Sequence, residues 1–495
     1  MKIRVVKTGS GAKAIQAVRY QNNKRIVIKH FGSCHTEGEI KELLLIADEW
    51  IKAYTGQLSI YPDNDPNTLL HTNHCTFLGV YYTFFYDLIS FLQKEIGFDN
   101  LDQPLLKDLV TIRIFEPASK LHSIELLKNY FGIVHQRKSF YKIAPEWLSM
   151  KENVEKKVID FAKKKYSFSF DLLFYDVTTL YFETFEEDAL RKNGFSKDNK
   201  SQQPQILVAL MVSREGFPVS YEVFSGNTFE GHTILPVVKE FIEKHSVKSF
   251  TVVADAAMIS MTNIEELRHN DINYIVGARL GNLSNNLIEQ IDKAIKREDG
   301  KSIRIKTDHG YLICNYSSAR YRKDKYEMEK QIEKAQASIN KPSKNRKLKF
   351  TKSSGEKLEL NQALIEKTRK LLGIKGYYTN LEETIVNNQT IIEHYHQLYK
   401  IEQAFRISKS DLETRPIFHF KQEPIKLHIL VCFMALVVSK HIELTTHNSI
   451  KRFIDECKKV TEARILNLIT NKEIRMNAIH TAQIKEYLIK LNVPH

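Results

Sequence analysis

Three acidic residues occupy positions from which they could act together in catalysis. Asp176 follows the apolar run 172–175 and Asp255 follows the run 251–254, so each is expected at the end of a β-strand, whereas Glu402 lies in a segment with helical periodicity. Two divalent ions about 3.5–4 Å apart need shared, hard oxygen ligands, and such a pair activates the attacking oxygen and stabilises the leaving oxygen of a phosphoryl transfer. The three carboxylates therefore indicate chemistry on a phosphodiester.

Each acid alone also has an ordinary structural explanation. A carboxylate after an apolar strand is usually a turn residue or a helix cap, and Glu402 alone would be a solvated helix residue. A turn would explain Asp176, because a second aromatic strand follows it, whereas Asp255 precedes small residues that leave room for a ligand. It is the combination of the three acids in this order that favours a catalytic site.

Cationic and aromatic residues surround Glu402. Lys409 follows it by seven residues, which at about 100° per residue would put both side chains on one face of a straight α-helix. Arg406 lies one turn beyond Glu402, and Arg415 belongs to the Arg-Pro pair expected to end the helix. As charges on a solvated helix face, these residues need no function.

The segment 395–409 carries a recognisable signature, Tyr-x2-Arg-x3-Glu-x6-Lys. It reads Tyr395, then Leu398 where Arg is usual, then Glu402 and Lys409. With this signature, the two aspartates and the intervening segment 194–233, the chain resembles bacterial insertion-sequence transposases of the DDE class, which have a ribonuclease H-like core. The departure at Leu398 affects one contact with a phosphate or DNA end and leaves the metal ligand in place.

The resemblance implies roles for these residues. Asp176, Asp255 and Glu402 would be the catalytic residues and the ligands of two Mg²⁺ ions, with Mn²⁺ as a substitute and Asp176 bridging both ions. By the resemblance, Tyr395 and Lys409 contact a DNA phosphate near the cleaved end. Arg406 could do the same from its place one turn beyond Glu402, and Arg415 is also expected to bind DNA.

The implied activity is DNA transposition. The enzyme would cut at the inverted terminal repeats of an insertion sequence and join the freed 3′-hydroxyl to target DNA, as a homodimer in a synaptic complex. Two alternatives remain open at this point: a metal-dependent DNA nuclease on the same core without strand transfer, and an inactive DNA-binding relic.

Composition supports a nucleic-acid partner. The 495 residues include 73 Lys or Arg against 59 Asp or Glu, a net charge of +14, and a basic balance of this size favours a polyanion. The five cysteines are scattered without a CxxC pair, so neither a disulfide framework nor a zinc module is indicated.

The expected location is the bacterial cytoplasm, in association with the nucleoid. The N-terminal segment lacks the apolar core of a signal peptide. The longest apolar run, 427–439, is shorter than the roughly 20 residues of a membrane span, so it predicts a buried helix and no membrane partner.

The expected fold class is α/β, a ribonuclease H-like mixed-sheet catalytic core with a β-rich basic insertion, a small N-terminal β element and a helical domain. The predicted parts are a small basic β/α element (1–60), a helical domain that binds DNA ends (61–165), the core (166–280 and 373–445), the insertion (281–372) and a C-terminal helical segment for dimerisation (446–495). The insertion holds 22 Lys or Arg against 12 Asp or Glu, a surplus of +10, which favours DNA contact over a merely solvated surface.

Overall fold

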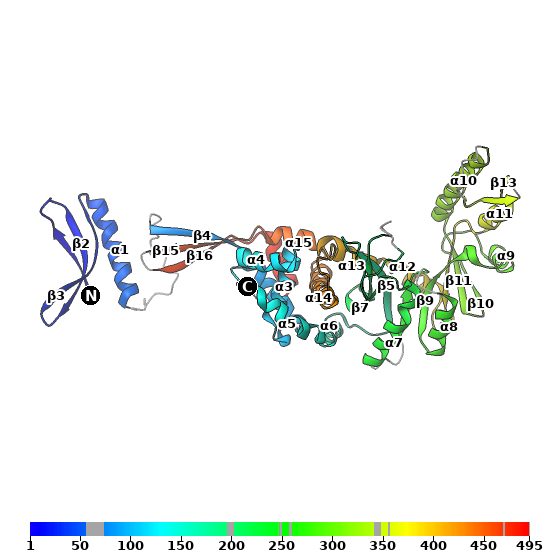
Figure 1. Cartoon of the computed structure of the whole chain (residues 1–495), viewed down its shortest axis with the longest axis horizontal. Helices are drawn as coiled ribbons and strands as arrows, with labels where there is room; N and C mark the ends of the chain where they lie inside the picture. Colours follow the sequence, from blue (N-terminus) through cyan, green and yellow to red (C-terminus); the bar gives the residue numbers. More distant parts are fainter. Residues whose placement is uncertain are drawn as a thin grey trace. The chain divides into compact units, whose positions relative to one another are not determined.

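The computed structural model describes residues 1–55, 74–195, 202–245, 247, 250–256, 260–340, 348–354, 357–468 and 471–494 (Figure 1). These residues form two compact units. One unit comprises Met1–Leu88, Leu127–Ile133 and Asp455–Glu486, and the other comprises Ile89–Leu126, Val134–Ile454 and Tyr487–His495. All three candidate acids belong to the second unit.

A mixed eight-stranded sheet forms the core of the second unit, with the strand order β10-β11-β14-β9-β8-β5-β6-β7. The strands are β5 (Leu172–Tyr181), β6 (Gln205–Ser213), β7 (Pro218–Ser225), β8 (Thr251–Ala254), β9 (Asn273–Ala278), β10 (Ser302–Thr307), β11 (Gly310–Tyr316) and β14 (Ile374–Thr379). β5, β6 and β7 are antiparallel, whereas β8 runs parallel to β5 and β9 runs parallel to β8. Three antiparallel strands followed by parallel ones are the ribonuclease H-like order, so the expected α/β fold class is confirmed.

β5 lies inside the sheet because its residues suit a strand that is covered on both faces. Its sequence LLFYDVTTLY is rich in aliphatic, aromatic and β-branched residues, and only Asp176 and Tyr181 are not fully buried. β6 is buried along its whole length. The expectation that Asp176 ends a strand is wrong, because β5 continues to Tyr181. Asp176 is instead a charged residue within an otherwise covered strand, a position that is costly unless the charge has partners.

The two faces of β5 meet different helices. On one face, Tyr175 Oη donates a hydrogen bond to Thr233 Oγ1 at 2.7 Å, just before α7 (Ile234–His245). On the other face, α12 (Asn388–His396) packs on β8 and β9, and α13 (Tyr399–Arg406) packs on β5 and β6. Since successive strand residues point to opposite faces, Asp176 points toward the side of α12 and α13.

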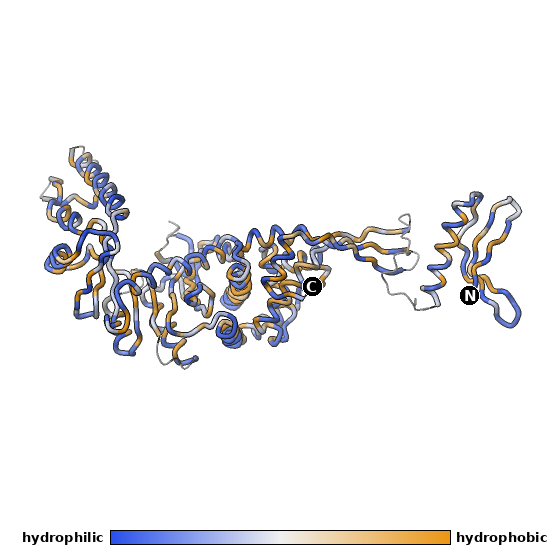
Figure 2. Tube along the Cα trace, turned by 180° about the vertical axis from the view of Figure 1, so that it is seen from behind, coloured by the Kyte–Doolittle hydropathy of each residue, from blue (hydrophilic) through white to orange (hydrophobic). Residues whose placement is uncertain are grey.

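α14 (Gln422–Thr446) is the central helix of this unit. It packs against β7 and against α3 (Pro104–Phe115), α5 (Arg137–Ser149) and α6 (Lys151–Tyr166). Its length and apolar composition would allow it to cross a membrane, but 94% of its most apolar window is buried inside the protein. The apolar run 427–439 thus lies in a longer buried helix, which is coloured as hydrophobic in Figure 2.

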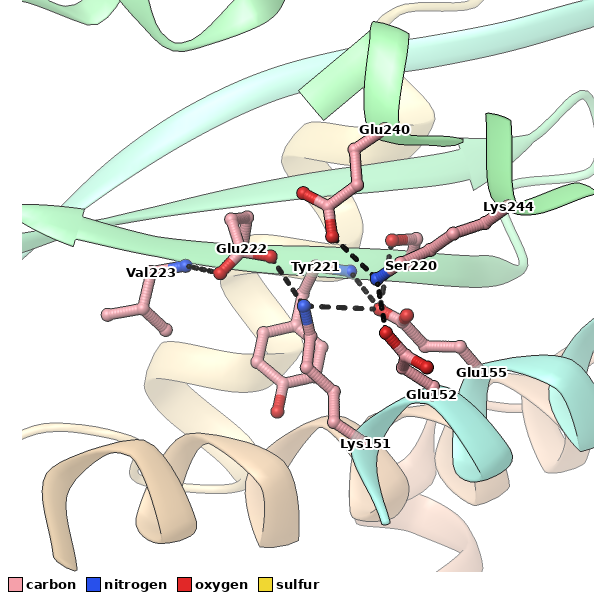
Figure 3. Close-up of polar contacts among 9 residues, drawn as sticks. All are labelled: Lys151, Glu152, Glu155, Ser220, Tyr221, Glu222, Val223, Glu240 and Lys244. Atoms are coloured by element: carbon pink, nitrogen blue, oxygen red, sulfur yellow. Dashed lines mark hydrogen bonds and ion pairs between the residues drawn. The ribbon is translucent and has the colours of Figure 1, made fainter. Parts of the chain in front are cut away.

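A polar network fixes α6 on β7 (Figure 3). The buried Glu155 carboxylate accepts hydrogen bonds from Ser220 Oγ at 2.9 Å and from the Tyr221 backbone N–H at 3.2 Å. Lys151 Nζ lies 3.8 Å from Glu155 and also pairs with Glu222. The buried carboxylate is therefore satisfied by specific donors, as buried polar groups generally are.

The N-terminal residues form a separate small sheet in which β2 (Lys13–Gln21) pairs with β1 (Lys2–Lys7) and β3 (Lys24–Cys34). α1 (Glu37–Thr55) covers this sheet through a small core that includes Ile15 and Ala47. Both the strands and the helix lie where residue alternation and helical periodicity predict them. The start of the predicted helical domain, at residue 61, falls outside the described residues.

Within the predicted helical domain (61–165), the expectation of helices from about Cys75 onward is wrong at its start. α2 (Thr83–Ile96), α3, α4 (Lys120–Phe131), α5 and α6 are helices, but β4 (Cys75–Tyr81) is a strand. β4 pairs with β15 (Glu462–Asn467), which also pairs with β16 (Lys472–Asn477). The segment 446–495 is therefore not wholly helical either: α15 (Ile450–Cys457) and α16 (Ala482–Lys490) flank a hairpin. β15 pairs with β4, which is almost 400 residues away in the sequence, and a local sequence pattern cannot reveal such a pairing.

The insertion also differs from the sequence-based expectation. β10 and β11, expected to belong to it, extend the core sheet through β14. The remainder holds α9 (Asn285–Ala294), α10 (Ser318–Asn340), α11 (Gln362–Lys370) and the hairpin of β12 (Thr351–Ser354) and β13 (Lys357–Leu360). α10, α11 and β13 contribute to a small core that includes Met328 and Phe350. α10 is largely hydrophilic (Figure 2).

Candidate active site

The register of two parallel strands places the first two acids next to each other. Tyr175 of β5 is paired with Ala254 of β8, and the following residues are Asp176 and Asp255. Paired residues in adjacent parallel strands point to the same face, so both carboxylates start from neighbouring positions at the end of β8. Asp176 is half-buried, with Oδ1 accepting the Val177 N–H at 2.8 Å, whereas Asp255 is exposed.

The third acid comes from the helices above this edge of the sheet. Glu402 lies in the first turn of α13 and is exposed, while its neighbours Ile401 and Phe405 are buried. Leu398, at the start of α13, is also buried. Leucine at this position lets the junction of α12 and α13 pack on apolar surface, where the Arg of the signature would bring a charge.

Tyr395 of α12 is joined directly to the second acid. Its side chain is buried, and Oη donates a hydrogen bond to Asp255 Oδ1 at 2.9 Å. Burial, followed by the charge of Asp255, raises the pKa of Tyr395, so the hydroxyl stays protonated and acts as a donor. The hydrogen bond ties α12 to the end of β8.

A glycine makes room for this hydroxyl. Gly277 of β9 lies so close that a Cβ there would be 2.5 Å from Tyr395 Oη and 3.1 Å from Ala256 Cβ. Any larger residue at 277 would push Tyr395 away from Asp255. The sequence contains no signal for this constraint, because it depends on how α12 packs over β9.

Lys375 of β14 is a cation at the site that the sequence pattern does not predict. Its Nζ lies 4.5 Å from the centre of the Tyr395 ring and 5.6 Å from that of Tyr377. Burial lowers the pKa of Lys375, and Arg320 acts in the same direction, whereas the negative charges of Asp255 and Glu402 oppose the shift. The ammonium group is therefore within electrostatic reach of two of the three acids.

A cavity of about 600 Å³ opens beside Asp255, between the core sheet and the insertion. Asp255, Tyr395 and Lys375 line it from the core, and Arg320 of α10 and Lys367 of α11 line it from the insertion. Two acidic side chains of α10, Asp324 and Glu327, also line it. The basic insertion thus places cations in the same cavity as a candidate catalytic acid.

Lys409 lies in a different environment from the one that straight-helix geometry predicts. α13 ends at Arg406 and continues as a π-helix over Ile407–Asp411, which widens the turn and breaks the 100° periodicity. The half-buried Lys409 lines a small, mostly apolar cavity with Thr178 of β5 and Cys432 of α14. It therefore lies along β5, two residues beyond Asp176.

The two arginines are separated. Arg406 is exposed at the end of α13, where its charge acts on Asp411. Arg415 is half-buried, and its guanidinium lies 5.3 Å from the centre of the Tyr181 ring at the end of β5. Arg415 and Lys409 thus both lie along β5. Arg415 is near Tyr181, at the opposite end of β5 from the residues that pair with β8.

The three acids suit divalent metal ions by their chemistry. They offer only carboxylate oxygens, the hard ligands that Mg²⁺ and Mn²⁺ prefer. Within the described ranges, no three His, Cys, Asp or Glu side chains come together closely enough to hold a metal ion. Asp255 and Glu402 are exposed, so their side chains can turn toward an ion.

Comparison with known protein families assigns the chain to a family. No curated protein matches the chain. Among solved structures, the piggyBac transposase synaptic complex with hairpin DNA is similar over 84% of this chain and 77% of that one, at 12% identity and a TM-score of 0.35. The family model of the transposase DDE domain matches residues 168–438, more than half of the chain, from just before β5, the strand that carries the first aspartate, into α14. The chain therefore belongs to the DDE transposase family.

Proposed function

We propose that this transposase cuts DNA at the inverted terminal repeats of an insertion sequence and joins the freed 3′-hydroxyl to target DNA by two-metal phosphoryl transfer. The observation that carries the proposal is the placement of Asp176 and Asp255 directly after the paired residues of β5 and β8, below the helices that carry Tyr395 and Glu402. Phosphoryl transfer depends mainly on positioning and charge stabilisation, and such an arrangement can supply both.

Asp176, Asp255 and Glu402 are the residues that we propose would hold two Mg²⁺ ions, with Mn²⁺ as a substitute. DDE transposases use divalent metals. When bound, two such ions supply activation of the attacking oxygen and stabilisation of the leaving oxygen. The protein's own part is to hold the acids in place, and the Tyr395 hydroxyl does so for Asp255.

The cations around the acids are the proposed DNA contacts. Lys375, Arg320 and Lys367 line the cavity beside Asp255, where a phosphate group would find positive charge next to the acids. Lys409 keeps the DNA-binding role that the resemblance implies, and Arg406 and Arg415 remain proposed DNA contacts. Tyr395 keeps it as well, with an added positioning role through its hydrogen bond to Asp255.

The proposed substrate also determines the assembly and the location. Cutting at both ends of one element requires two active sites, so we propose a homodimer in a synaptic complex with both terminal repeats. Because the substrate is the bacterial chromosome, we place the enzyme at the nucleoid, in the cytoplasm.

The decisive experiment uses a DNA fragment that carries the flanking ends of the protein's own gene. The full chain is incubated with this fragment, a supercoiled plasmid as target and Mg²⁺, beside an Asp176→Asn variant. Asp171→Asn is the matched control, because Asp171 is an exposed aspartate that comes just before the same strand. We expect metal-dependent cutting at the repeat boundary and DNA joined to the plasmid, both lost in Asp176→Asn and kept in Asp171→Asn.

The products separate the alternatives. Cutting without any joined DNA would make the protein a metal-dependent nuclease. Binding to the end fragment without cutting, at any Mg²⁺ or Mn²⁺ concentration, would make it a DNA-binding relic. Equal activity of Asp176→Asn and the unmodified protein would show that Asp176 takes no part in the reaction.

A further inference from the structure

A second cluster of charged residues lies away from the three acids, below the loop that follows the π-helix. It comprises Arg113 near the end of α3, Lys120 at the start of α4, His428 in α14 and His419 in the loop before α14. Arg113 and Lys120 are each 3% exposed and His428 is 4% exposed. Two basic side chains, Arg113 and Lys120, are thus removed from water at one place.

Neither cation has an acidic partner among the described residues. Lys120 Nζ lies 3.3 Å from His428 Nδ1, and Arg113 Nη2 donates to the Ala118 carbonyl at 2.6 Å. Arg113 Nε is buried without any hydrogen-bond partner. In the part of the chain that the structure describes, neither Arg113 nor Lys120 forms an ion pair, and the one carboxylate lining the same cavity, Glu413, belongs to an exposed residue.

The histidines of the cluster do not add positive charge. His428 Nε2 lies 2.9 Å from the Thr414 carbonyl and must donate to it, so Nδ1 accepts from the Lys120 ammonium and the ring is neutral. Burial, followed by the charges of Lys120 and Arg113, lowers the pKa of His428 well below its ordinary value and lowers the pKa of His419 to about 4. The positive charge therefore belongs to Arg113 and Lys120.

The cluster encloses a space of suitable size. Arg113, Lys120, His419 and His428 line a cavity of about 70 Å³ together with Ser119. A cavity needs roughly 10–15 Å³ of such space per water molecule, so this one has room for a few waters or one small oxyanion. Lys120 begins α4, directly after Ser119, and the first backbone N–H groups and the dipole of this helix favour an anion.

We propose that Arg113, Lys120 and the first turn of α4 form a binding site for a tetrahedral oxyanion, namely a phosphate group. A buried charge without a partner is strongly unfavourable, and an anion in this cavity would supply the missing partner for both cations and for Arg113 Nε. The phosphate group has two possible sources, free inorganic phosphate and the DNA backbone. The site needs neither the acids nor their metal ions, so it stands or falls separately from the proposed function.

The pH dependence of binding follows from the groups around Lys120. These are Arg113 from α3, His428 and Cys432 from α14, and His419 and Glu413 from the loop. Burial, followed by the charge of Arg113, lowers the pKa of Lys120 to about 7, so the lysine loses its charge as the pH rises through neutrality. Anion affinity should therefore fall between pH 6 and pH 8.5.

The test measures binding of inorganic sulfate to the full chain, because sulfate keeps the same charge over this pH range. The thermal midpoint is followed at increasing sulfate concentration and constant ionic strength, with chloride as the compensating anion. Lys120→Met is compared with Lys128→Met, an exposed lysine of the same helix. We expect the thermal midpoint of the unmodified protein and of Lys128→Met to rise with sulfate concentration and to saturate. For Lys120→Met, the apparent sulfate affinity should be at least tenfold lower. For the unmodified protein, binding should be weaker at pH 8.5 than at pH 6.

A second measurement keeps the proposal testable if Lys120→Met does not fold. Broadening of the ³¹P signal of inorganic phosphate by the unmodified protein, reversed by sulfate, would show the same site, and Arg113→Gln should abolish it. A short duplex that displaces the phosphate would assign the site to the DNA backbone, whereas phosphate that stays bound with DNA present would assign it to the free ion. Equal effects of sulfate and chloride, or unchanged sulfate binding by Lys120→Met, would overturn the proposal.

Discussion

The hydroxyl of Tyr395 donates a hydrogen bond of 2.9 Å to Asp255 and thereby joins α12 to the end of β8. Asp255 follows the last residue of its strand and is exposed, so the strand alone does not fix its side chain. A buried tyrosine whose raised pKa keeps it protonated provides a fixed donor at this point. The orientation of a candidate metal ligand thus depends on a residue of the covering helix.

Replacing Tyr395 by Phe removes this donor and keeps the ring. A hydrogen bond to a charged group contributes about 1.5–3 kcal/mol, which corresponds to roughly a 10- to 100-fold lower rate if the bond is needed in the transition state. Single-turnover cleavage of an end fragment measures the rate. Tyr377→Phe is the matched control, because Tyr377 Oη lies 3.2 Å from His396 Nε2, in the same aromatic group but away from the acids. Rates of Tyr395→Phe within twofold of the control would show that the hydrogen bond has no part in catalysis.

Gly277→Ala should reproduce the loss caused by Tyr395→Phe. The new Cβ would lie 2.5 Å from Tyr395 Oη, so the tyrosine must move and its hydrogen bond to Asp255 must lengthen or break. Because both changes act on one interaction, the double variant should be hardly slower than either single variant. Gly281→Ala, which meets nothing within 4 Å, is the control and should cleave at the normal rate. Additive losses in the double variant would contradict this coupling.

Lys375→Met is expected to weaken DNA binding without destabilising the protein. A lysine that contacts a phosphate contributes similarly for all sequences, and its removal lowers the slope of log affinity against log salt by about one. Lys293→Met, on the surface of α9, is the control for a general loss of charge. The measurement is a salt titration of binding to end DNA and to unrelated DNA. An unchanged salt slope would mean that Lys375 contacts no phosphate.

The stability of the same variant has a predictable pH dependence. Burial lowers the pKa of Lys375 in the folded protein, so folding disfavours its charged form. This penalty is fully present below the lowered pKa and disappears as the pH rises toward the ordinary lysine pKa. Urea midpoints of Lys375→Met should therefore equal or exceed those of the unmodified protein at pH 7, and the difference should shrink at higher pH. A lower midpoint at pH 7 would show that the ammonium stabilises the fold.

The core of the fold could be predicted from the sequence because its signals are local. β5 begins with an apolar run and carries Asp176, and β8 is an apolar run followed directly by Asp255. Each run predicts a buried strand without knowledge of the strand it pairs with. The signature around Glu402 marks the last core helix. Fold class and family follow from these elements, and both are confirmed.

What the sequence could not predict depends on contacts between distant segments. Lys375 becomes part of the site only because β14 pairs with β9. Within the sequence, the only hint of this role is that a lysine occurs in the otherwise uncharged strand IKGYYT. β4, β15 and β16 form a sheet only with one another, so their alternating polar residues did not stand out. Lys409 leaves the face of Glu402 because the helix continues as a π-helix, which periodicity alone does not reveal.

The buried Glu155 gives a further test, one that concerns stability alone. Burial raises the pKa of Glu155 despite its hydrogen bonds from Ser220 and Tyr221 and the charge of Lys151 (Figure 3). Its contribution to stability is therefore fully present below the ordinary glutamate pKa and is lost as the pH rises through the raised folded pKa. Glu155→Gln keeps an oxygen acceptor for both hydrogen bonds but carries no charge to bury.

The stability of Glu155→Gln relative to the unmodified protein should accordingly increase between pH 4 and pH 7.5, as measured by urea midpoints. Glu152→Gln is the control: this glutamate lies on the same helix and pairs with Lys244, but 72% of its side chain is exposed, so its relative stability should change little. A relative stability of Glu155→Gln that falls over the same range would mean that the ion pair with Lys151 outweighs the cost of burying the carboxylate. The network between α6 and β7 would then depend on charge pairing rather than on neutral hydrogen bonds.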